Sequence, residues 1–226
     1  MRKLIFLILL LVSCSAWGQN LNGNGTQSMV VPQITSGSYN TNHIMVSQLP
    51  GSDMGAKINA CLALLGRGGN LICDATDIIG NQTVASTVTC NVANAVILLG
   101  PGLVLSSSAD PIFDLSAWAC SVIANNGETP EYTSIIATGA ANDIFRCDGP
   151  NCFNNTIASM GMYANVRGNG GARTGGAAIH LHGGSAHVEN VEISQTYNGI
   201  QIDDHSSCLA CTNLKFIHHE IGRAHV

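Results

Sequence analysis

Two short segments near the end of the chain alternate apolar residues with residue types that could do chemistry. The first segment carries His180 and His182, and the second, further along the chain, carries Gln201 and Asp203. Alternate side chains of a strand share a face, so in two paired strands His180 lies near Gln201 and His182 near Asp203, about 4.8 Å apart. A histidine beside a carboxylate can act as an acid or a base near neutral pH. We therefore predict Asp203 and His182 as catalytic residues and His180 and Gln201 as substrate-binding residues, with a solvated polar face as the alternative.

Asp203 and Asp204 form the only adjacent acidic pair in the sequence. Glycosidases place two carboxyl groups about 5 to 10 Å apart around the bond that they cleave. Neighbouring residues of a strand point to opposite faces, so Asp204 can act together with Asp203 only if it lies in a turn. We add Asp204 to the predicted catalytic residues, with a role in a turn or on the surface as the alternative.

A glycine-rich segment, Arg167–Gly176, contains two arginines. It lacks the Gly-Lys-Ser/Thr ending of a phosphate-binding loop, and no helical pattern follows it. We interpret it as a loop that projects between strands. Arg173 is predicted to bind an acidic sugar of the substrate, and a plain insertion is the alternative.

The strands that carry these residues recur at nearly constant spacing. Ile179 and Ile200 occupy the same place in two similar segments, and Val191 and Leu214 do so in two others at almost the same separation. Two different strands that recur with nearly one period indicate a coiled repeat, in which each turn of the chain stacks on the previous one. Ile179 is expected to stack on Ile200, and Val191 on Leu214, inside a continuous core.

One amphipathic helix precedes these strands. Ile58, Cys61 and Leu62 fall at helical spacing, and Asp53 suits the N-cap position. From Leu71 on, short apolar alternations are separated by Gly, Asn, Asp and Ser, and no convincing second helical pattern follows. The sequence therefore predicts an all-β fold of many short strands with one helix near its N-terminus.

The helix segment MGAKINACLALL, the following GGNLI and the later NVEISQTYNGIQI resemble the pectate-lyase-like superfamily. The resemblance covers residues 53–219 and implies a right-handed parallel β-helix, a solenoid whose open end is capped by the N-terminal helix. The superfamily includes polysaccharide lyases, glycoside hydrolases and adhesins, so the fold alone does not select an activity. The chain departs from the polygalacturonase-type pattern, because the Asn-Thr-Asp, Gly-His-Gly and Arg-Ile-Lys motifs are missing around Asp203 and Asp204.

Pectate lyases of this fold use Ca²⁺, an ion that takes six to eight oxygen ligands. Asp203, Asp204, Glu189 and Glu192 are candidate ligands, but no spacing among them specifies a site. We predict no metal ligand and leave calcium open as a cofactor. Glu192 is instead expected to pair with Lys215 on a neighbouring strand, as an exposed ion pair that contributes little stability.

The composition sets broad limits on the function. Of 226 residues, 46% are hydrophobic and 10% are charged, which suits a folded core and excludes a disordered chain. The net charge is −5 and no basic stretch is present, so nucleic acid is not an expected partner. Without residues 1–18 and 220–226, Lys plus Arg is 6 and Asp plus Glu is 13, and the resulting net charge of −7 disfavours anionic polymers held by bulk charge alone.

Residues 1–18 have the layout of a secretory signal peptide. A basic start precedes nine apolar residues, Leu4–Val12, which are too few to span a bilayer, and no other stretch is long enough to do so. Cleavage near Gly18 is the preferred interpretation, which makes the protein secreted, periplasmic or bound to the cell surface. A lipobox that places a lipid anchor on Cys14 is the alternative.

Three further segments complete the predicted organisation. Residues 19–50 are interpreted as a linker and residues 51–219 as the β-helix domain. Residues 220–226, EIGRAHV, match the translation of a common sequencing adapter. We therefore expect this tail to be foreign to the gene and the domain to be truncated.

Nine cysteines are present, and eight of them follow the leader. An even number in an exported chain indicates disulfides. Cys147 and Cys152 flank Asp-Gly-Pro-Asn, a turn sequence that can bring them together. Cys208 and Cys211 form a CxxC motif, for which a structural disulfide is preferred over a metal or redox site.

Two functions follow from these observations. The first is an exported enzyme that acts on a polysaccharide by lyase or glycoside hydrolase chemistry. The second is a non-catalytic, adhesin-like surface protein whose long face binds glycans. An enzyme requires carboxylates, Arg or Lys to converge on one face over three or more repeats, and this feature separates the two.

Overall fold

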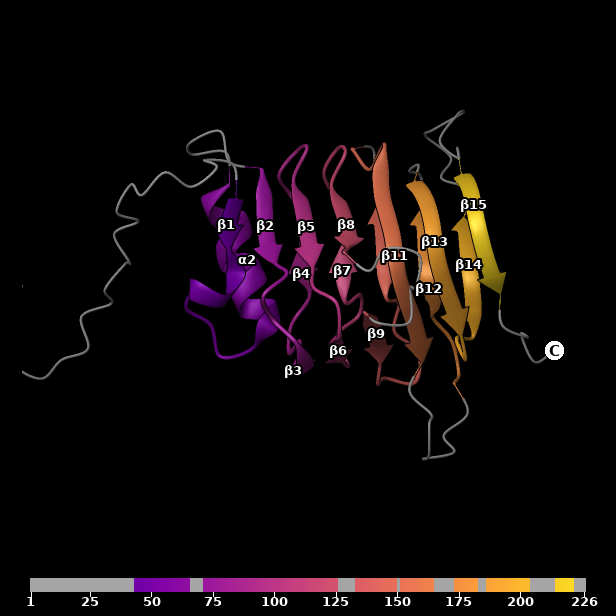
Figure 1. Ribbon diagram of the computed structural model, residues 1–226. Coiled ribbons are helices and arrows are strands. Elements are labelled where there is room, and N and C mark those ends of the chain that lie inside the picture. The colour runs from indigo at the N-terminus through magenta and orange to yellow at the C-terminus, as the bar shows by residue number, and fades with distance from the viewer. Residues whose placement is uncertain are drawn as a thin grey trace, which may run out of the picture. The chain divides into compact units, whose positions relative to one another are not determined.

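The computed structural model describes residues 43–65, 71–125, 133–149, 151–164, 173–182 and 186–203, and the backbone of residues 214–221. These residues belong to one compact unit, Asn40–Val226, which is rich in strands (Figure 1). Its elements are β1 (His43–Met45), the 3-10 helix η1 (Val46–Gln48), α2 (Met54–Leu64), β2 (Ile72–Ala75), β3 (Gly80–Thr83), β4 (Val88–Thr89), β5 (Val96–Leu99), β6 (Leu103–Ser107), β7 (Phe113–Asp114), β8 (Ser121–Ala124), β9 (Ser134–Ala137), β10 (Phe145–Asp148), β11 (Asn155–Ala164), β12 (Ala177–His182), β13 (Ala186–Ser194), β14 (Asn198–Asp203) and β15 (Leu214–Ile221).

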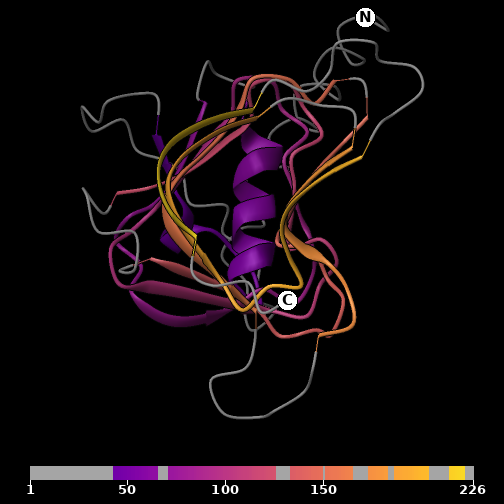
Figure 2. The same cartoon turned by 90° about the vertical axis from the view of Figure 1, so that its right-hand side faces the viewer.

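The helix α2 forms where the sequence predicts it. The side chain of Asp53 accepts a hydrogen bond from the backbone N–H of Ala56 at 3.2 Å, which caps the first turn as expected. Ile58, Cys61 and Leu62 are buried on one side of the helix. Figure 1 places α2 beside β1 and β2, and along the stack it lies inside the outline of the strands (Figure 2). The helix therefore covers one end of the core.

The strands fall into three sets, and the chain contributes one strand to each set in turn, in the same order each time. β2, β5, β8 and the first half of β11 make one set, and β3, β6, β9 and the second half of β11 make another. β4, β7, β10, β12 and β14 make the third set, a separate five-stranded sheet. Neighbouring strands in every set pair in parallel, and we call one pass through the sets a repeat. This arrangement confirms a strand-rich fold of stacked repeats.

The register of the five-stranded sheet agrees with the sequence. Ile179 of β12 pairs with Ile200 of β14, as predicted. In the interior of the stack, Phe113 and Phe145 from consecutive repeats stack with their ring centroids 5.1 Å apart. The largest fully buried side chains belong to the same core, and they are Phe113, Phe145, Ile58, Ile97, Leu99, Leu103, Leu105, Ile112, Leu115, Ile135, Ile144 and Ile157.

The predicted stack of Val191 on Leu214 is wrong. Val191 pairs with His219, and Leu214 pairs with Ala186. Alternation of apolar and polar residues has a period of two, so it is compatible with several registers. The left-handed backbone of Asn190, with φ of 50°, also interrupts β13 and shifts the alternation on its two sides.

One corner of the stack repeats an unusual backbone conformation. Asn94, Ala119 and Asn154, which lie just before β5, β8 and β11, have φ of 60°, 54° and 58°. The N–H of Asn94 donates to the carbonyl of Trp118 at 2.9 Å, and the N–H of Ala119 donates to that of Phe153 at 2.7 Å. Because L-residues rarely adopt this conformation, asparagine suits the corner and alanine does not.

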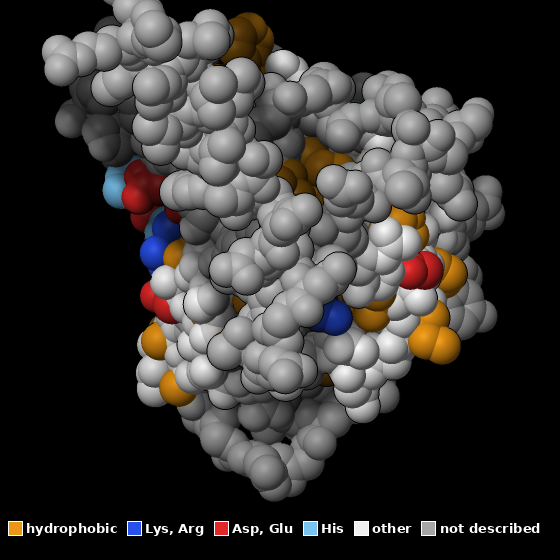
Figure 3. Space-filling model, turned by 90° about the vertical axis from the view of Figure 1, so that its left-hand side faces the viewer, with side chains coloured by type: hydrophobic (Ala, Val, Ile, Leu, Met, Phe, Trp, Pro, Cys, Tyr) orange, Lys and Arg blue, Asp and Glu red, His pale blue; other side chains and the backbone are white. Residues whose placement is uncertain are grey.

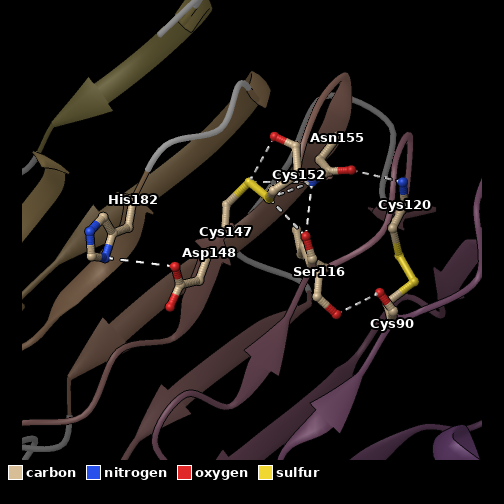
Figure 4. The surroundings of a disulfide bond; sticks show 9 residues. Cys90, Ser116, Cys120, Cys147, Asp148, Cys152, Asn155 and His182 are labelled. Atoms are coloured by element: carbon tan, nitrogen blue, oxygen red, sulfur yellow. Dashed lines mark hydrogen bonds and ion pairs between the residues drawn. A yellow bond between two sulfur atoms is a disulfide. The ribbon is translucent and has the colours of Figure 1, made fainter. Parts of the chain in front are cut away.

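Disulfides are concentrated at the same corner and beneath α2. The predicted pair Cys147–Cys152 is confirmed, with a Cα separation of 5.6 Å. Buried Asn155 lies beside it, accepts from the N–H of Cys120 at 2.8 Å and donates to the carbonyl of Leu115 at 3.1 Å (Figure 4). Cys208 and Cys211 lie outside the described residues. The other disulfides among the described cysteines are Cys61–Cys73 and Cys90–Cys120.

Several predictions concern segments that the structure describes little or not at all. The leader, the Cys14 lipobox and most of the linker lie outside the described residues, although His43–Met45 within the linker forms β1. The strand β15 extends to Ile221, which belongs to the expected tail. In the described ranges, every helix is too short or too polar to cross a membrane.

Candidate functional site

The outer side of the five-stranded sheet carries aspartates, an arginine and two histidines from neighbouring strands. We call this surface the charged face. Asp114, Arg146, His180 and Gln201 form one row across β7, β10, β12 and β14, because the pairing registers place them side by side. Viewed from the end that carries α2, acidic, basic and histidine side chains gather along one edge of the molecule (Figure 3). A second row consists of Asp148, His182 and Asp203.

His180 lies between two carboxylates. Its Nδ1 is 2.8 Å from Oδ2 of Asp143, and its Nε2 is 2.6 Å from Oδ2 of Asp203. The backbone register places His182 opposite Asp203 as predicted, but the short contact of Asp203 is with His180 in the neighbouring row. Side chains lean along the strand, so the backbone partner and the side-chain partner differ.

Asp143 is the buried centre of this network. Only 4% of its side chain is exposed. Its Oδ2 accepts two hydrogen bonds from Arg146, from Nε at 2.9 Å and from Nη2 at 2.7 Å, and its Oδ1 accepts from the N–H of Ala177 at 2.8 Å. Arg146 also donates to Oδ1 of Asp110 at 2.7 Å. A buried carboxylate requires such donors, because its desolvation is otherwise costly.

The network sets the proton affinities of its members. Burial lowers the pKa of His180, but the hydrogen bonds and charges of Asp203 and Asp143 outweigh burial and leave this pKa raised. The hydrogen bonds from His180 and Gln201 lower the pKa of Asp203. The pair therefore favours an imidazolium beside an ionised carboxylate on the charged face.

His182 has a different environment from His180 on the same strand. Its ring is nearly parallel to that of His180, with centroids 6.2 Å apart. Its Nδ1 lies 3.7 Å from Oδ1 of Asp148, a long ion-pair distance (Figure 4). The His182 side chain is 38% exposed against 16% for His180. His182 is therefore more exposed than His180, and it lies between Asp148 and Asp203 in the second row.

Asp114 and Asp148 form a second carboxylate pair. Burial and the charge of Asp148 raise the pKa of Asp114, against the opposing charge of Arg146. Asp114 pairs with Arg146, and Asp148 follows Arg146 on the same side of β10. Strand spacing of about 4.8 Å and a rise of about 3.3 Å per residue place the Cα atoms of Asp114 and Asp148 about 8 Å apart.

Of the other predicted site residues, Gln201 lies on the charged face, and Arg173 lies in a loop. The Nε2 of Gln201 donates to both carboxylate oxygens of Asp203 at 3.2 Å. Asp204 lies outside the described residues. Arg173 donates to the carbonyls of Gly139 at 3.0 Å and Asn142 at 2.6 Å, so its guanidinium joins two loops.

The acidic residues considered for calcium are divided between two sheets. Asp203 lies on β14, whereas Glu189 and Glu192 lie on β13 of the other sheet. The expected partner of Glu192 is wrong: it pairs with Glu220 in the backbone register, and its Oε2 accepts from the hydroxyl of Tyr163 at 2.9 Å. Within the described ranges no group of three or more His, Cys, Asp or Glu is arranged to hold a metal ion.

The sequence did not predict three charged residues of this face, Arg146, Asp148 and Asp143. Arg146 and Asp148 alternate with buried Phe145 and Cys147, which is the same signal that identifies His180 and His182. A search by repeat period does not find this strand, because many more residues separate β10 from β12 than separate β12 from β14. Asp143 has no such signal, because it lies in the loop before its strand.

No family model matches the chain, and neither a curated protein nor a solved structure matches it. A function therefore has to be inferred from the residues of the charged face. The face combines a buried ionic network with two exposed carboxylates, Asp148 and Asp203. These are groups that can donate and accept protons.

Proposed function

We propose that this protein is an exported glycoside hydrolase that cleaves a neutral polysaccharide on its charged face. The observation that carries the proposal is the convergence of carboxylates, an arginine and histidines from four neighbouring strands of one sheet. These strands belong to consecutive repeats, so the convergence exceeds the three repeats that an enzyme requires. A surface that only binds glycans does not need titratable groups held at fixed spacing.

The fold that we propose for this function is the right-handed parallel β-helix, with α2 as its N-terminal cap. Parallel pairing throughout the three sets supports it. Crossovers between parallel strands of one sheet are right-handed in about 98% of cases. The resemblance of the sequence to the pectate-lyase-like superfamily points to the same architecture. Such a stack holds side chains from different repeats at constant spacing, as a polymer substrate requires.

Asp114 and Asp148 are the proposed acid and base. Asp114 and Asp148 lie on the same face of neighbouring strands, with Cα atoms about 8 Å apart. Inverting glycosidases likewise use two carboxyl groups, with a water molecule between them. Burial and the charge of Asp148 raise the pKa of Asp114, which is the direction that a general acid requires. Asp148 is 54% exposed and can accept a proton from the attacking water.

The rest of the charged face is proposed to bind sugar hydroxyl groups. His182 lies between Asp148 and Asp203 in the second row. The sequence predicts Asp203 as catalytic, but we propose a binding role for it, because His180 and Gln201 already hydrogen-bond its carboxylate. Its lone pairs and the imidazole and amide groups beside it suit the mixed donors and acceptors of a sugar ring.

Hydrolysis of a neutral polymer is favoured over lyase chemistry on an acidic one. A lyase has to neutralise the carboxylate of a uronic acid, which requires cations that face the substrate. Arg146 is bound by Asp143 and Asp110, and Arg173 donates to loop carbonyls. The net charge of −5 also repels a polyanion.

Export is part of the proposal. Three disulfides within the described ranges fit an oxidising compartment, because thiols in the cytosol are kept reduced. The leader-like residues 1–18 point in the same direction. Together they support a secreted, periplasmic or cell-surface location.

The test is a turnover assay with a panel of neutral and acidic polysaccharides. We expect the full chain to release reducing ends from a neutral polymer. Asp114→Asn and Asp148→Asn should each lower this rate by about 100-fold or more, because each removes a proton-transfer group. Glu189→Gln is the matched control, since Glu189 is an exposed acid on the other sheet.

Two outcomes would contradict this proposal. Unsaturated uronate products from an acidic polymer would show lyase chemistry. Equal activity of Asp114→Asn, Asp148→Asn and the wild type would remove the carboxylate pair from the reaction. The stereochemistry gives a further check, because an inverting enzyme releases the opposite anomer, which NMR detects in fresh product.

A non-catalytic glycan-binding surface is the second candidate. Trp118 and Tyr197 are each 59% exposed, and aromatic rings with one polar atom are favoured contacts at binding surfaces. Binding of a polysaccharide without any turnover, lost in Trp118→Ala or Tyr197→Ala, would favour this candidate. Binding that depends on Asp114 and Asp148 would favour the hydrolase.

A further inference from the structure

The two histidines on the outer side of β12 differ in one partner. His180 and His182 share a strand and a face, and their rings are nearly parallel. Behind His180 lies the buried carboxylate of Asp143, whereas His182 has the exposed carboxylate of Asp148 at ion-pair distance. Asp143 is therefore the partner that distinguishes His180 from His182.

The contacts of His180 require both of its nitrogens to carry hydrogen. A neutral imidazole has one N–H, so one of its nitrogens would direct a lone pair at a carboxylate oxygen. The distances to Asp143 and Asp203 are 2.8 Å and 2.6 Å, both short enough for charge-assisted hydrogen bonds. Only the imidazolium satisfies both contacts at once while the two carboxylates are ionised.

Asp143 is held so firmly that it cannot turn away from His180. Its carboxylate receives hydrogen bonds from Arg146 and from the N–H of Ala177, which fix both oxygens. Its own N–H donates to Oδ1 of Asp110 at 2.9 Å. These partners come from the loop before β7, from β10 and from the start of β12, so three segments fix one carboxylate.

We propose that Asp143 is a positioning residue, which holds His180 as a doubly protonated imidazolium and thereby fixes Asp203 as an oriented, ionised carboxylate for sugar binding. The binding part of this inference rests on the proposed function, and the protonation part does not. Asp143 itself is 4% exposed, so it acts through His180 and does not touch a substrate.

Other charged groups near His180 come from every element packed around it. Arg146 and Asp148 are the charged groups of β10, Asp110 lies in the loop before β7, and Arg173 lies within electrostatic range of Asp143. His182 is on the same strand, and Asp203 is the charged group of β14. Of these, only Asp143 and Asp203 form hydrogen bonds with the ring of His180 among the described contacts.

The first experiment measures the protonation of His180 by NMR in the full, oxidised chain. In the wild type, His180 should keep both N–H protons to a pH above the ordinary histidine pKa of about 6.5. Asp143→Asn should move the titration of His180 to lower pH. Asp148→Asn is the matched control and should leave His180 unchanged.

The second experiment separates binding from chemistry. If the protein is a hydrolase, Asp143→Asn should raise KM for the neutral polymer several-fold and change kcat less, because the altered group binds substrate. The effect should grow with pH, as His180 loses its proton earlier in the variant. A purely structural role would lower the amount of folded enzyme and leave the pH profile of KM unchanged.

The outcomes distinguish this inference from the proposed function. An unchanged His180 titration in folded Asp143→Asn overturns the inference, whatever the activity. An altered titration without polymer turnover in the wild type retains the protonation role and removes the hydrolase. Should Asp143→Asn not fold, the wild-type titration decides, since a His180 that loses its proton at or below the ordinary histidine pKa of about 6.5 contradicts the proposal.

Discussion

The first repeats and the later repeats of the stack are held together by different means. One disulfide ties α2 to β2, and another links the first repeat to the second. Between β10, β12 and β14 the described links are hydrogen bonds between charged groups, from Asp143 through His180 to Asp203. Both regions share the same parallel backbone pairing, so the side chains alone make the difference.

This difference separates stability from reactivity along the stack. A disulfide contributes stability at any neutral pH and adds no titratable group to a surface. The charged links respond to pH, and they present Asp203 and His180 on the face where we place the substrate. The first region thus adds covalent links to its backbone pairing and core, whereas in the second region charged groups that link the strands are also candidates for binding.

The largest expected effect tests whether the two regions share one core. Phe145 stacks on Phe113 in the previous repeat and pairs with Ile179 in the next. Phe145→Ala should lower the free energy of unfolding by about 3–5 kcal/mol, because it leaves a cavity at the junction. Urea denaturation should show one transition at lower urea concentration. Two separate transitions, with only one shifted, would mean that the regions unfold independently. Ile79→Ala, at a side chain 69% exposed, is the control and should change little.

Removal of a disulfide should weaken the first region. The double variant Cys90→Ser with Cys120→Ser opens a loop closed across a sequence separation of 30. It should cost about 2–5 kcal/mol of unfolding free energy. Denaturation under oxidising conditions measures this cost, and the difference between wild type and variant should disappear once both are reduced. A variant as stable as the oxidised wild type would show that the backbone pairing alone holds the first repeats.

The later region should be the pH-sensitive one. The pKa of His180 is raised in the folded chain, so its contribution to stability is present below the unfolded value of about 6.5 and is lost as pH rises through the folded value. The pKa of Asp203 is lowered, so its contribution is lost as pH falls through its folded value. His180→Gln should therefore reduce stability most between about pH 4 and 6.5, and progressively less at alkaline pH. Urea midpoints across pH measure this, with His182→Gln as the control. An equal effect of His180→Gln at every pH would exclude the ionic contribution.

The smallest effect concerns the corner of the stack. Ala119 has a left-handed backbone, which costs an L-residue about 1–2 kcal/mol and glycine nothing comparable. Ala119→Gly should raise the free energy of unfolding by about 0.5–1 kcal/mol. Ala117→Gly, at a nearby buried position without positive φ, should lower it instead. A destabilised Ala119→Gly would mean that the methyl group makes contacts worth more than the strain.

Much of the fold could be predicted from local patterns. The cap at Asp53 and the apolar spacing in α2 are signals within a few residues, and both are confirmed. The pairing of Ile179 with Ile200 could be predicted because only short connections separate their strands from the intervening β13. β13 pairs with β15 as the repeat indicates, but their register could not be predicted, because the alternation of buried residues shifts at Asn190.

The candidate site was predicted only in part, and the reason is geometric. His180, His182, Gln201 and Asp203 were found because they alternate with apolar residues in similar strands. Asp143 has no periodic neighbour, and its contact with His180 joins residues 37 positions apart. Because the loops before the strands vary in length, such contacts have no constant spacing in the sequence and cannot be predicted from it.

The position of α2 has a consequence for how the chain can be made. It covers one end of the core, and it precedes every complete repeat in the order of synthesis. Each later repeat pairs mainly with the one before it, so a finished repeat can serve as the template for the next. The chain is synthesised from its N-terminus, so α2 and the first repeats leave the ribosome before the later ones. The repeats can therefore fold one after another, starting at α2, and the strands of the charged face are completed last.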